Sequence, residues 1–244
     1  MIIGLDKVFK PIWVYKILKL TKPGIEVKSL QDEFYDIIEY DGLTAKRKTL
    51  TIIKRYYLNI EKNKGKFYFA SSYLHKLSLK YSYESLKTLL LFVLLMNCPI
   101  ANFLTLKINK LFITTEEINS DILRSIAKDK YGDRRIVSFA VNYFLTILSY
   151  FDVLNKDKNK YIWKNRKLTV SNDILKEILI LYAQFRDNFE IDISSIYDDI
   201  SFSFIDLNNL ESVLMEYNGV DWVYQKRFNS KKAIVKNKYK HLKI

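Results

Sequence analysis

The residues of this chain best suited to chemistry are cations at the start of an apolar helix. In the stretch "YGDRRIVSFAVNYFLTILSYF", a glycine precedes Asp133, a possible N-cap, and two arginines, Arg134 and Arg135, follow. The helix dipole disfavours cations at a helix N-terminus, so a negatively charged partner would explain this placement. The alternative is that both arginines are solvated surface residues.

A polar stripe continues from these arginines along the helix predicted over residues 133–151. Its members are spaced by three or four residues, which puts them on one face of an otherwise apolar helix. Arginine suits guanine edges or phosphate, asparagine suits adenine, and serine suits phosphate. The stripe is therefore predicted to contact DNA, although any amphipathic helix also needs a polar face for solvent. The members are Arg135, Ser138, Asn142, Thr146 and Ser149.

A lysine-rich turn follows this helix. The segment "NKDKNKYIWKNRKLTV" is typical of a β-hairpin, with Tyr161 and Trp163 expected to anchor it to the core. Cations in such a hairpin would contact phosphates and carry no sequence information. They are Lys156, Lys158 and Lys160, followed by Lys164, Arg166 and Lys167.

The N-terminal third contains a second basic set. "DGLTAKRKTLTIIKRYYLNI" predicts a helix with Thr44 as N-cap, and "EKNKGKFYF" predicts a polar turn and an aromatic strand. This helix is more uniformly basic, so it suits backbone contact better than base reading, although a charge run is also typical of a solvated face. The cations are Lys46, Arg47, Lys48, Lys54 and Arg55 on the helix, and Lys62, Lys64 and Lys66 in the turn.

Motifs for catalysis and metal binding are absent from the sequence. His75 and His241 lie far apart and have no partner at a metal-ligand spacing. The glycine-rich phosphate loops and the nucleophile-elbow motif do not occur. Carboxylate pairs could bind Mg²⁺ for a nuclease, but without a nearby placed lysine such pairs are usually surface residues. We therefore expect a non-catalytic protein without a metal or cofactor. The pairs are Asp36 with Glu39 and Asp198 with Asp199.

The charge is unevenly distributed. The net charge is +13, yet residues 187–221 carry nine acids and no Lys or Arg, and residues 222–244 carry eight bases and no acid. This segregation suggests a body that binds polyanions, an acidic segment and a basic C-terminal tail. The alternative is that the acidic segment and the tail pair with each other.

The single cysteine and the most apolar segment favour a cytoplasmic protein. Cys98 cannot form an internal disulfide, and its apolar setting predicts a buried thiol. The apolar run over residues 89–96 is much shorter than the roughly 20 residues that span a bilayer, so it predicts a core helix. The N-terminus lacks the pattern of a signal peptide.

Helical spacing dominates the rest of the chain, and one order of elements occurs twice. Residues 27–40, 83–113 with a break near Pro99, and 172–186 are predicted to be helical, and "TTEEINSDILRSIAKDKYG" opens with a capping signal of Thr114 or Thr115 with Glu117. "LNIEKNK" at 58–64 matches "LNKDKNK" at 154–160 at five of seven positions, about 96 residues apart. Each copy follows two helices and precedes an aromatic strand, which indicates a repeated architecture. Short helices around 195–217 and a hairpin in "VYQKRFNSKKAIVK" complete the prediction.

The order helix, turn, helix and hairpin is typical of a winged helix, a relative of the helix-turn-helix. We therefore predict a mainly α fold with short β-hairpins, in which winged-helix units surround a helical core. The predicted divisions are an N-terminal winged-helix-like unit over 1–82, a helical core with a second such unit over 83–186, and the acidic segment with the basic tail over 187–244.

Three stretches resemble the BrxA-type proteins of BREX phage-defence systems. They are "DGLTAKRKTLTIIKRYYLNI", "LLLFVLLMNCPIANFLTLKINKLF" and "YGDRRIVSFAVNYFLTILSYFDVLNKDKNKYIW", and they agree with that family in order and character over about two-thirds of the chain. The resemblance implies a small, non-enzymatic DNA-binding accessory protein of a prokaryotic antiviral defence system. It does not extend to residues 187–244, and no functional residue is carried over from it.

The sequence thus favours a cytoplasmic, non-catalytic protein that binds double-stranded DNA, with other defence-system proteins as further partners and without a membrane. Two alternatives remain open at this point. One is a protein–protein adaptor that uses winged-helix units as scaffolds and docks a basic partner on the acidic segment. The other is an RNA-binding protein.

Overall fold

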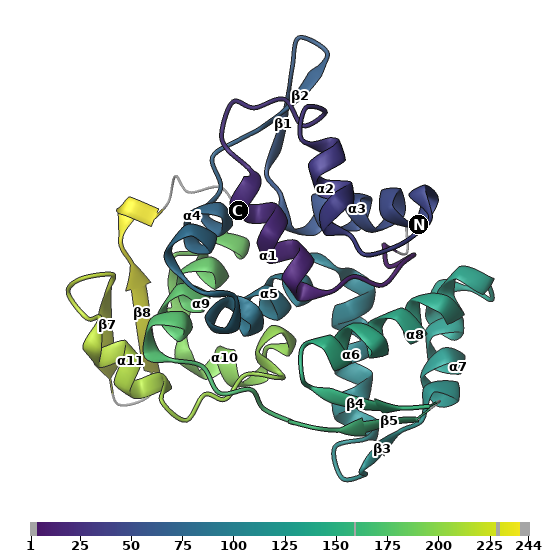
Figure 1. The fold of residues 1–244 in the computed structure, drawn as a ribbon. Helices are drawn as coiled ribbons and strands as arrows, with labels where there is room; N and C mark the ends of the chain where they lie inside the picture. The colour runs from purple at the N-terminus through teal and green to yellow at the C-terminus, as the bar shows by residue number, and fades with distance from the viewer. Residues whose placement is uncertain (1–3, 159, 228–229, 240–244) are drawn as a thin grey trace.

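The computed structural model describes residues 4–158, 160–227 and 230–239. The fold is mainly α with short antiparallel hairpins, as predicted (Figure 1). One order of elements occurs three times along the chain: a helix, a short strand, two helices and a β-hairpin. We refer to the three occurrences as the first unit (residues 11–69), the second unit (99–163) and the third unit (172–235).

In the first unit, a two-residue turn closes the hairpin, with Lys64 and Gly65 both at positive φ. This is the backbone of the turn type that matches the twist of paired strands, and glycine adopts it without strain. A single bridge between Glu26 and Tyr68 takes the place of the first strand. The elements are α1 (Pro11–Leu20), α2 (Gln31–Ile37), α3 (Leu43–Tyr57), β1 (Ile60–Asn63) and β2 (Lys66–Phe69).

The second and third units repeat this order with a complete first strand. In both, that strand pairs with the last strand of the hairpin, which gives the sheet orders β3-β5-β4 and β6-β8-β7. The second unit contains α6 (Pro99–Leu111), β3 (Glu117–Ile118), α7 (Ser120–Tyr131), α8 (Arg135–Tyr150), β4 (Leu154–Asp157) and β5 (Lys160–Trp163). The third contains α9 (Asn172–Phe185), β6 (Glu190–Asp192), α10 (Ile193–Asp198), the 3₁₀ turn η1 (Ile200–Phe202), α11 (Leu210–Glu216), β7 (Trp222–Arg227) and β8 (Ser230–Val235), followed by η2 (Asn237–Tyr239).

One ion pair recurs in all three units at the same place in the sheet. A glutamate on the first strand lies opposite a residue of the last strand, and a lysine two positions earlier on that last strand binds the glutamate. In the second unit, Glu117 is opposite Ile162 and pairs with Lys160 at 2.9 Å. The equivalent pairs are Glu26 with Lys66 and Glu190 with Lys232. The shared geometry supports three copies of one architecture.

The hairpins correct the repeat inferred from the sequence. Asn63 and Asp157 both directly precede the turns, where they pair with Lys66 and Lys160. Equivalent hairpin residues therefore differ by 94 positions, and the match of "LNIEKNK" to "LNKDKNK" at a spacing of 96 is out of register by two. The lysine- and asparagine-rich composition produces the similarity, whereas strand pairing sets the equivalence.

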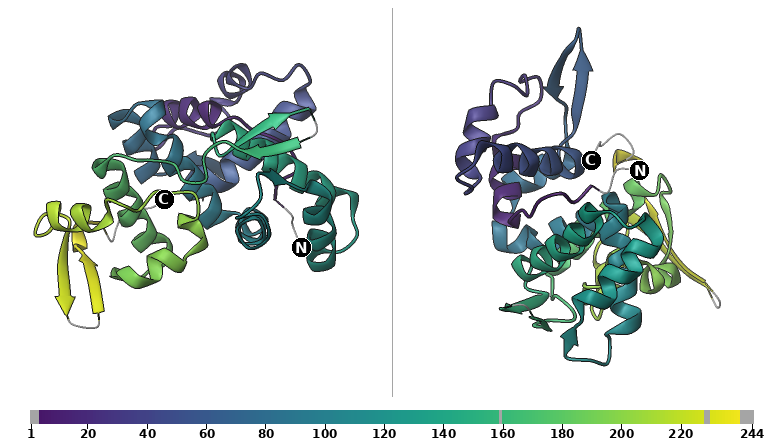
Figure 2. Two further views of the ribbon diagram at one scale, coloured as in Figure 1. Left: turned by 90° about the horizontal axis from the view of Figure 1, so that it is seen from below. Right: turned by 90° about the vertical axis from the view of Figure 1, so that its right-hand side faces the viewer.

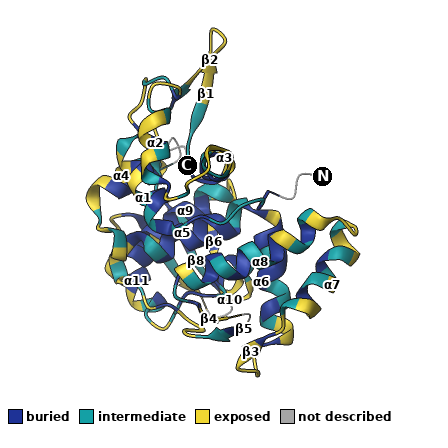
Figure 3. Cartoon of the chain, turned by 45° about the vertical axis from the view of Figure 1, so that its right-hand side comes forward, coloured by how far each residue is buried: buried dark blue, intermediate teal, exposed yellow. Residues whose placement is uncertain are grey.

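The three units pack around a connector between the first and second units. The connector consists of α4 (Tyr73–Lys80) and α5 (Tyr83–Asn97), and the run over residues 89–95 is buried, as predicted. The buried hydrophobic residues form one continuous cluster (Figure 3). Among the described residues, no single helix is both long and apolar enough to cross a membrane. α5 and α6 meet that criterion only as a pair, and they bend by 105° at their junction. Cys98 lies buried there, as expected.

A buried polar cluster joins the connector to the third unit. The Glu177 carboxylate of α9 is only 3% exposed and accepts hydrogen bonds from the hydroxyls of Tyr73 and Tyr81. Lys80 and Lys176 each lie 3.3 Å from the same carboxylate. Removing a partner from a buried charge costs several kcal/mol of stability, so the cluster fixes α9 against α4.

The C-terminal third is a folded unit, so the description of residues 222–244 as a tail is wrong for the described part. Its strands were predicted as a hairpin, and its bases pair with the acids of the preceding segment. Glu211 binds Lys226 and Lys231, while the buried Asp221 binds Lys238. The alternative in which the acidic segment and the basic segment pair is the one observed. The predicted boundary at residue 187 falls inside this unit, because α9 is its first helix.

The helix caps also differ from the sequence-based expectation. α3 begins after Gly42 rather than Thr44, and α8 begins after Arg134 while Asp133 binds Lys128 at 2.8 Å. Asn119 caps α7, whereas Glu117 lies in β3. Several polar residues compete for each helix start, and the strand that precedes α7 decides the outcome there.

Candidate nucleic-acid interface

The two arginines that begin α8 lie at an exposed corner of the second unit. Arg134 is the N-cap residue and donates to the carbonyl oxygen of Tyr131 at 3.2 Å. The Arg135 guanidinium lies over the ring of Phe139, 5.1 Å from its centroid. Both remain exposed and neither forms an ion pair with a described residue. They are accessible to an anion.

The rest of the predicted polar stripe is engaged within the second unit. Asn142 accepts a hydrogen bond of 2.7 Å from Arg124 of α7, and Thr146 bonds the hydroxyl of Tyr161 in β5 at 2.9 Å. Ser149 donates to the carbonyl oxygen of Thr146. Ser138 is half-buried on the same side. Asn142 and Thr146 hold α8 against α7 and the hairpin, so the prediction that Asn142 reads a base is not supported by its contacts.

The outward side of α8 carries aromatic rings instead. Phe139 and Tyr143 stack with centroids 6.0 Å apart, and Phe139 is 36% exposed. Tyr150, the last residue of α8, is 37% exposed. Sequence reasoning missed this face because aromatic residues were assigned to the core. The signal was present, since positions 135, 139 and 143 share the four-residue spacing of one helix face.

The β4–β5 hairpin is anchored as predicted, and only its tip remains free. Tyr161 is buried, and the indole nitrogen of Trp163 donates to the carbonyl oxygen of Phe112 at 3.1 Å. Arg166 donates to main-chain carbonyls of residues 112, 113 and 115, so it joins the hairpin to the end of α6.

Three of the predicted hairpin lysines also have partners within the unit. Lys160 binds Glu117, Lys164 binds Asp152, and Lys156 lies over the Tyr161 ring. Lys167 donates to the carbonyl oxygen of Ser203. Lys158 at the tip is the one predicted hairpin lysine without a described side-chain partner.

The first unit presents more free cations than the second. Of the predicted residues on α3, Lys46 donates to the carbonyl oxygen of Tyr35 at 2.7 Å and is a structural contact. Arg47 and Lys48 are exposed. Lys54 is half-buried, and the loss of solvation lowers its pKa. Neither an ion pair nor a side-chain hydrogen bond joins the last three to any described residue.

The β1–β2 hairpin extends this basic surface. It projects from the body of the molecule beside α3 (Figures 1 and 2), and its tip is exposed (Figure 3). Lys62 and Lys64 are exposed and have no side-chain partner in the described chain, whereas Lys66 binds Glu26 at 3.0 Å. The helix and the hairpin that follows it together carry four exposed cations without a described side-chain partner: Arg47, Lys48, Lys62 and Lys64.

The helix in the equivalent position of the third unit has the opposite charge. α3 contains five cations and no acid, and α8 contains one arginine and no acid. In contrast, α11 contains Glu211 and Glu216 and no base. Of the three helices, α3 therefore offers a polyanion the most positive charge, whereas α11 carries acids, of which Glu211 is paired with Lys226 and Lys231.

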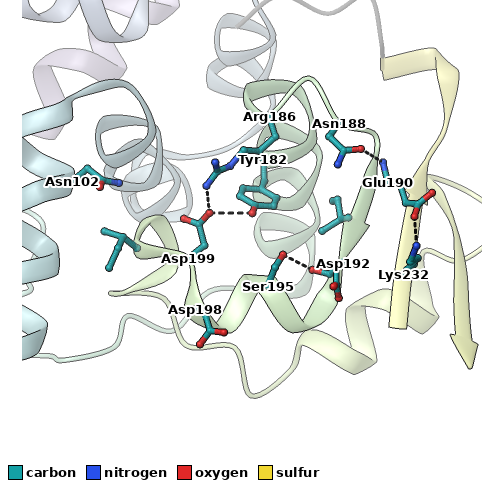
Figure 4. Close-up of a pocket in the computed structure, with 12 residues that line it drawn as sticks. Asn102, Tyr182, Arg186, Asn188, Glu190, Asp192, Ser195, Asp198, Asp199 and Lys232 are labelled. Carbon is teal, nitrogen blue, oxygen red and sulfur yellow. Dashed lines mark hydrogen bonds and ion pairs between the residues drawn. The ribbon is translucent and has the colours of Figure 1, made fainter. Parts of the chain in front are cut away.

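The paired carboxylates do not form a metal site in the described residues. Asp199 accepts hydrogen bonds from Tyr182 and Arg186 at the wall of a cavity of about 780 Å³, and Asp198 points away from them (Figure 4). Burial alone would raise the pKa of Asp199, but hydrogen bonds from Ser201, Arg186 and Tyr182 outweigh it and lower the pKa below its ordinary value.

The remaining candidates for metal binding are also dispersed. Glu39 binds Lys10, and His75 bonds the carbonyl oxygen of Leu18. His241 lies outside the described residues. No cluster of three or more possible metal ligands occurs in the part of the chain that the structure describes.

Comparison with protein-family models, with curated proteins and with solved structures gives no match to this chain. The function of the protein is therefore inferred from the geometry and charges described above.

Proposed function

We propose that this protein is a non-catalytic, cytoplasmic protein that binds double-stranded DNA through winged-helix units, chiefly the first one. The observation that carries the proposal is the surface of α3 and the β1–β2 hairpin, where Arg47, Lys48, Lys62 and Lys64 have no side-chain partner among the described residues. In a winged helix, the helix before the hairpin enters the major groove and the hairpin contacts the backbone. The second unit adds Arg134, Arg135 and Lys158.

Phosphate neutralisation would supply most of the affinity. Exposed cations without carboxylate partners can bind phosphates and release counterions from the DNA, and no ion pair within the protein has to break first. The outward side of α8 offers rings rather than paired hydrogen-bond donors and acceptors, so we infer weak sequence preference.

Charge reversal on the proposed surface tests this function. The variant with Arg47, Lys62 and Lys64 all changed to Glu should bind a random duplex roughly tenfold or more weakly at moderate salt. A control variant changes three exposed lysines on other helices, Lys16, Lys76 and Lys110, to Glu, and thus alters the net charge equally. It should retain the affinity within about twofold. Equal losses in both variants, or no loss in either, would refute the proposed surface.

RNA binding is distinguished by competition. If single-stranded RNA displaces duplex DNA from the unmodified protein at lower concentration than unlabelled duplex does, RNA is the preferred partner. We expect the unlabelled duplex to compete better, because α3 and the projecting hairpin present their charges as a helix–wing pair suited to a groove and its flanking phosphates.

An adaptor function for the third unit is the second candidate. Its helix α11 is acidic, and Met215 is 57% exposed there. The adaptor proposal predicts that reversing Glu216 and Asp198 to Lys disrupts a complex with a basic protein and leaves DNA affinity unreduced. The resemblance to BrxA-type proteins further supports a role as an accessory component of a phage-defence system. Deletion of the gene from such a system should then abolish or weaken phage restriction.

A further inference from the structure

A cavity of about 490 Å³ lies under the projecting hairpin of the first unit. Its walls come from the start of α2, from α3 and from both hairpin strands, and they include Val27, Gln31, Lys54, Ile60 and Phe67. A volume of this size accommodates a small organic ligand. The cations at the cavity are Lys54 of α3, Lys28 before α2 and Lys66 beside the hairpin turn.

Lys54 contributes an unpaired ammonium group to this cavity. It is half-buried, and burial lowers its pKa, yet no described carboxylate or carbonyl group binds it. Lys28, at the rim, is exposed and also lacks a described side-chain partner, while Lys66 is already paired with Glu26. A partly desolvated cation without a counter-ion is costly in a folded protein. An anionic group entering the cavity would remove that cost.

Phe67 gives the same cavity an accessible aromatic ring. It lies on the same strand face as Phe69, two positions along, which is buried against Phe34. Phe67 itself is 54% exposed. In the second unit the equivalent residue is Tyr161, which is 6% exposed and fills the space between hairpin and helix by bonding Thr146. The first unit leaves this space open.

We propose that this cavity holds one unpaired nucleotide of a bound DNA, with its base against Phe67 and Ile60 and its phosphate at Lys54. The ligand must combine a flat apolar body with a negative charge, and a nucleotide has both. This inference rests on the proposed DNA binding, since the hairpin and α3 would place the DNA at the mouth of the cavity. It predicts that the protein prefers duplex ends, overhangs or extruded bases to continuous duplex.

The preference is measured with three DNAs that share one short duplex. The first is blunt, the second has a single-stranded 3′ overhang containing 2-aminopurine, and the third has an overhang of equal length made of abasic residues. The abasic overhang carries the same phosphates without bases. Stacking of one base on an aromatic ring strengthens binding by about 5- to 150-fold. We therefore expect the overhang that contains 2-aminopurine to bind at least about fivefold tighter than the abasic overhang. Its 2-aminopurine fluorescence should be quenched on binding.

Two variants and one control assign the preference to the cavity. Phe67→Leu keeps an apolar side chain and removes the ring, and Lys54→Met removes the charge. Phe67→Leu should reduce the ratio of affinities for the base-containing and abasic overhangs to about one, whereas Lys54→Met should weaken both overhangs relative to the blunt duplex. Tyr68→Leu removes an aromatic ring from the opposite face of the same strand and should preserve the ratio. Thermal melting of each variant verifies that the fold is retained.

The outcomes separate this inference from the proposed function. Tight binding of the blunt duplex with equal affinity for both overhangs would overturn the nucleotide cavity and leave DNA binding intact. Absence of binding to all three DNAs would refute the proposed function and with it the basis of the inference. Free dAMP serves as the last probe: if it binds the protein as tightly as the overhang does, the cavity is a site for soluble nucleotides and the inference is wrong.

Discussion

Asn142 illustrates how the partner of a polar side chain is set by its neighbours in space. On the helical wheel it belongs to the face with Arg135, which is exposed. In the fold, Arg124 from the preceding helix reaches the same side of α8 and donates a hydrogen bond to the side-chain amide oxygen of Asn142. An amide that already accepts a charge-assisted hydrogen bond is a poor candidate for base reading, because that bond would have to break first.

Gly4 is a residue for which the backbone and the packing both demand glycine. Its φ is +86°, and a methyl group at its Cα would clash with the hydroxyl of Tyr56. Gly4→Ala should therefore lower the free energy of unfolding by more than the roughly 1–2 kcal/mol that a left-handed backbone costs an ordinary residue. Urea denaturation followed by circular dichroism measures the loss.

Gly24 provides the matched control for that substitution. Its φ is +85°, but no atom lies within 4 Å of the position that a methyl group would occupy. Gly24→Ala should thus show the backbone cost alone. If the two alanine variants lose the same stability, the proposed clash with Tyr56 does not contribute.

The Asp199 carboxylate should make the protein less stable in acid. Burial raises its pKa, but its bonds to Ser201 and Arg186 lower it more, so the folded pKa lies below the ordinary value of 3.8. The unfolded chain therefore binds this proton more readily than the folded chain does. The stabilisation is present above that ordinary value and is lost as the pH falls through the folded pKa.

This pH dependence is measured as the urea midpoint of unfolding at a series of acidic pH values. Asp199→Asn should lower the midpoint at neutral pH and flatten its decline on acidification. The exposed Asp198→Asn variant supplies the comparison and should follow the unmodified protein. A decline of the same steepness in the Asp199 variant would show that other carboxylates cause the acid sensitivity.

At the scale of elements, three helices with the same place in the unit differ in charge. α3 is basic, α8 has two exposed arginines at its start, and α11 is acidic. The ion pair between first and last strand is nevertheless retained in all three units. Strand pairing thus sustains the architecture, while the outward helix faces are free to differ in their partners.

The β1–β2 hairpin should account for a measurable part of the salt dependence of DNA binding. Changing Lys62 and Lys64 together to Ala removes two free cations, which should make the slope of log affinity against log salt less steep by about 1.8 if each contacts a phosphate. Lys160→Ala is the control, because that lysine is engaged by Glu117. It should alter the slope by less than one such contact. An unchanged slope in the double variant would place the DNA elsewhere.

At the scale of the whole molecule, one core links the three units. The buried hydrophobic residues form a single cluster, and the Glu177 cluster joins the third unit to the connector. Each unit contains one tryptophan: Trp13, Trp163 and Trp222. Fluorescence can therefore report on each unit separately.

Three single-tryptophan variants, with the other two changed to Phe, test whether the units unfold together. In each variant, the fluorescence transition in urea should coincide with the circular dichroism transition, because a shared core makes unfolding cooperative. The midpoints of different variants will differ, since Trp13 and Trp222 are buried. A fluorescence transition that precedes the circular dichroism transition in any variant would identify a unit that unfolds independently.

The local periodicity and composition of the sequence determined the helix positions, the lysine-rich hairpins and the excess of positive charge. These features depend on neighbours a few residues apart, so a single chain displays them directly. The internal repeat in the sequence did not reveal the third unit. Its likeness to the other two lies in strand order and in one cross-strand ion pair, and both form only when residues distant along the chain meet. Tertiary structure alone also decided which cations are free. Lys160 and Lys62 look alike in the sequence, but a glutamate brought in by β3 neutralises the first, and the projection of its hairpin leaves the second exposed.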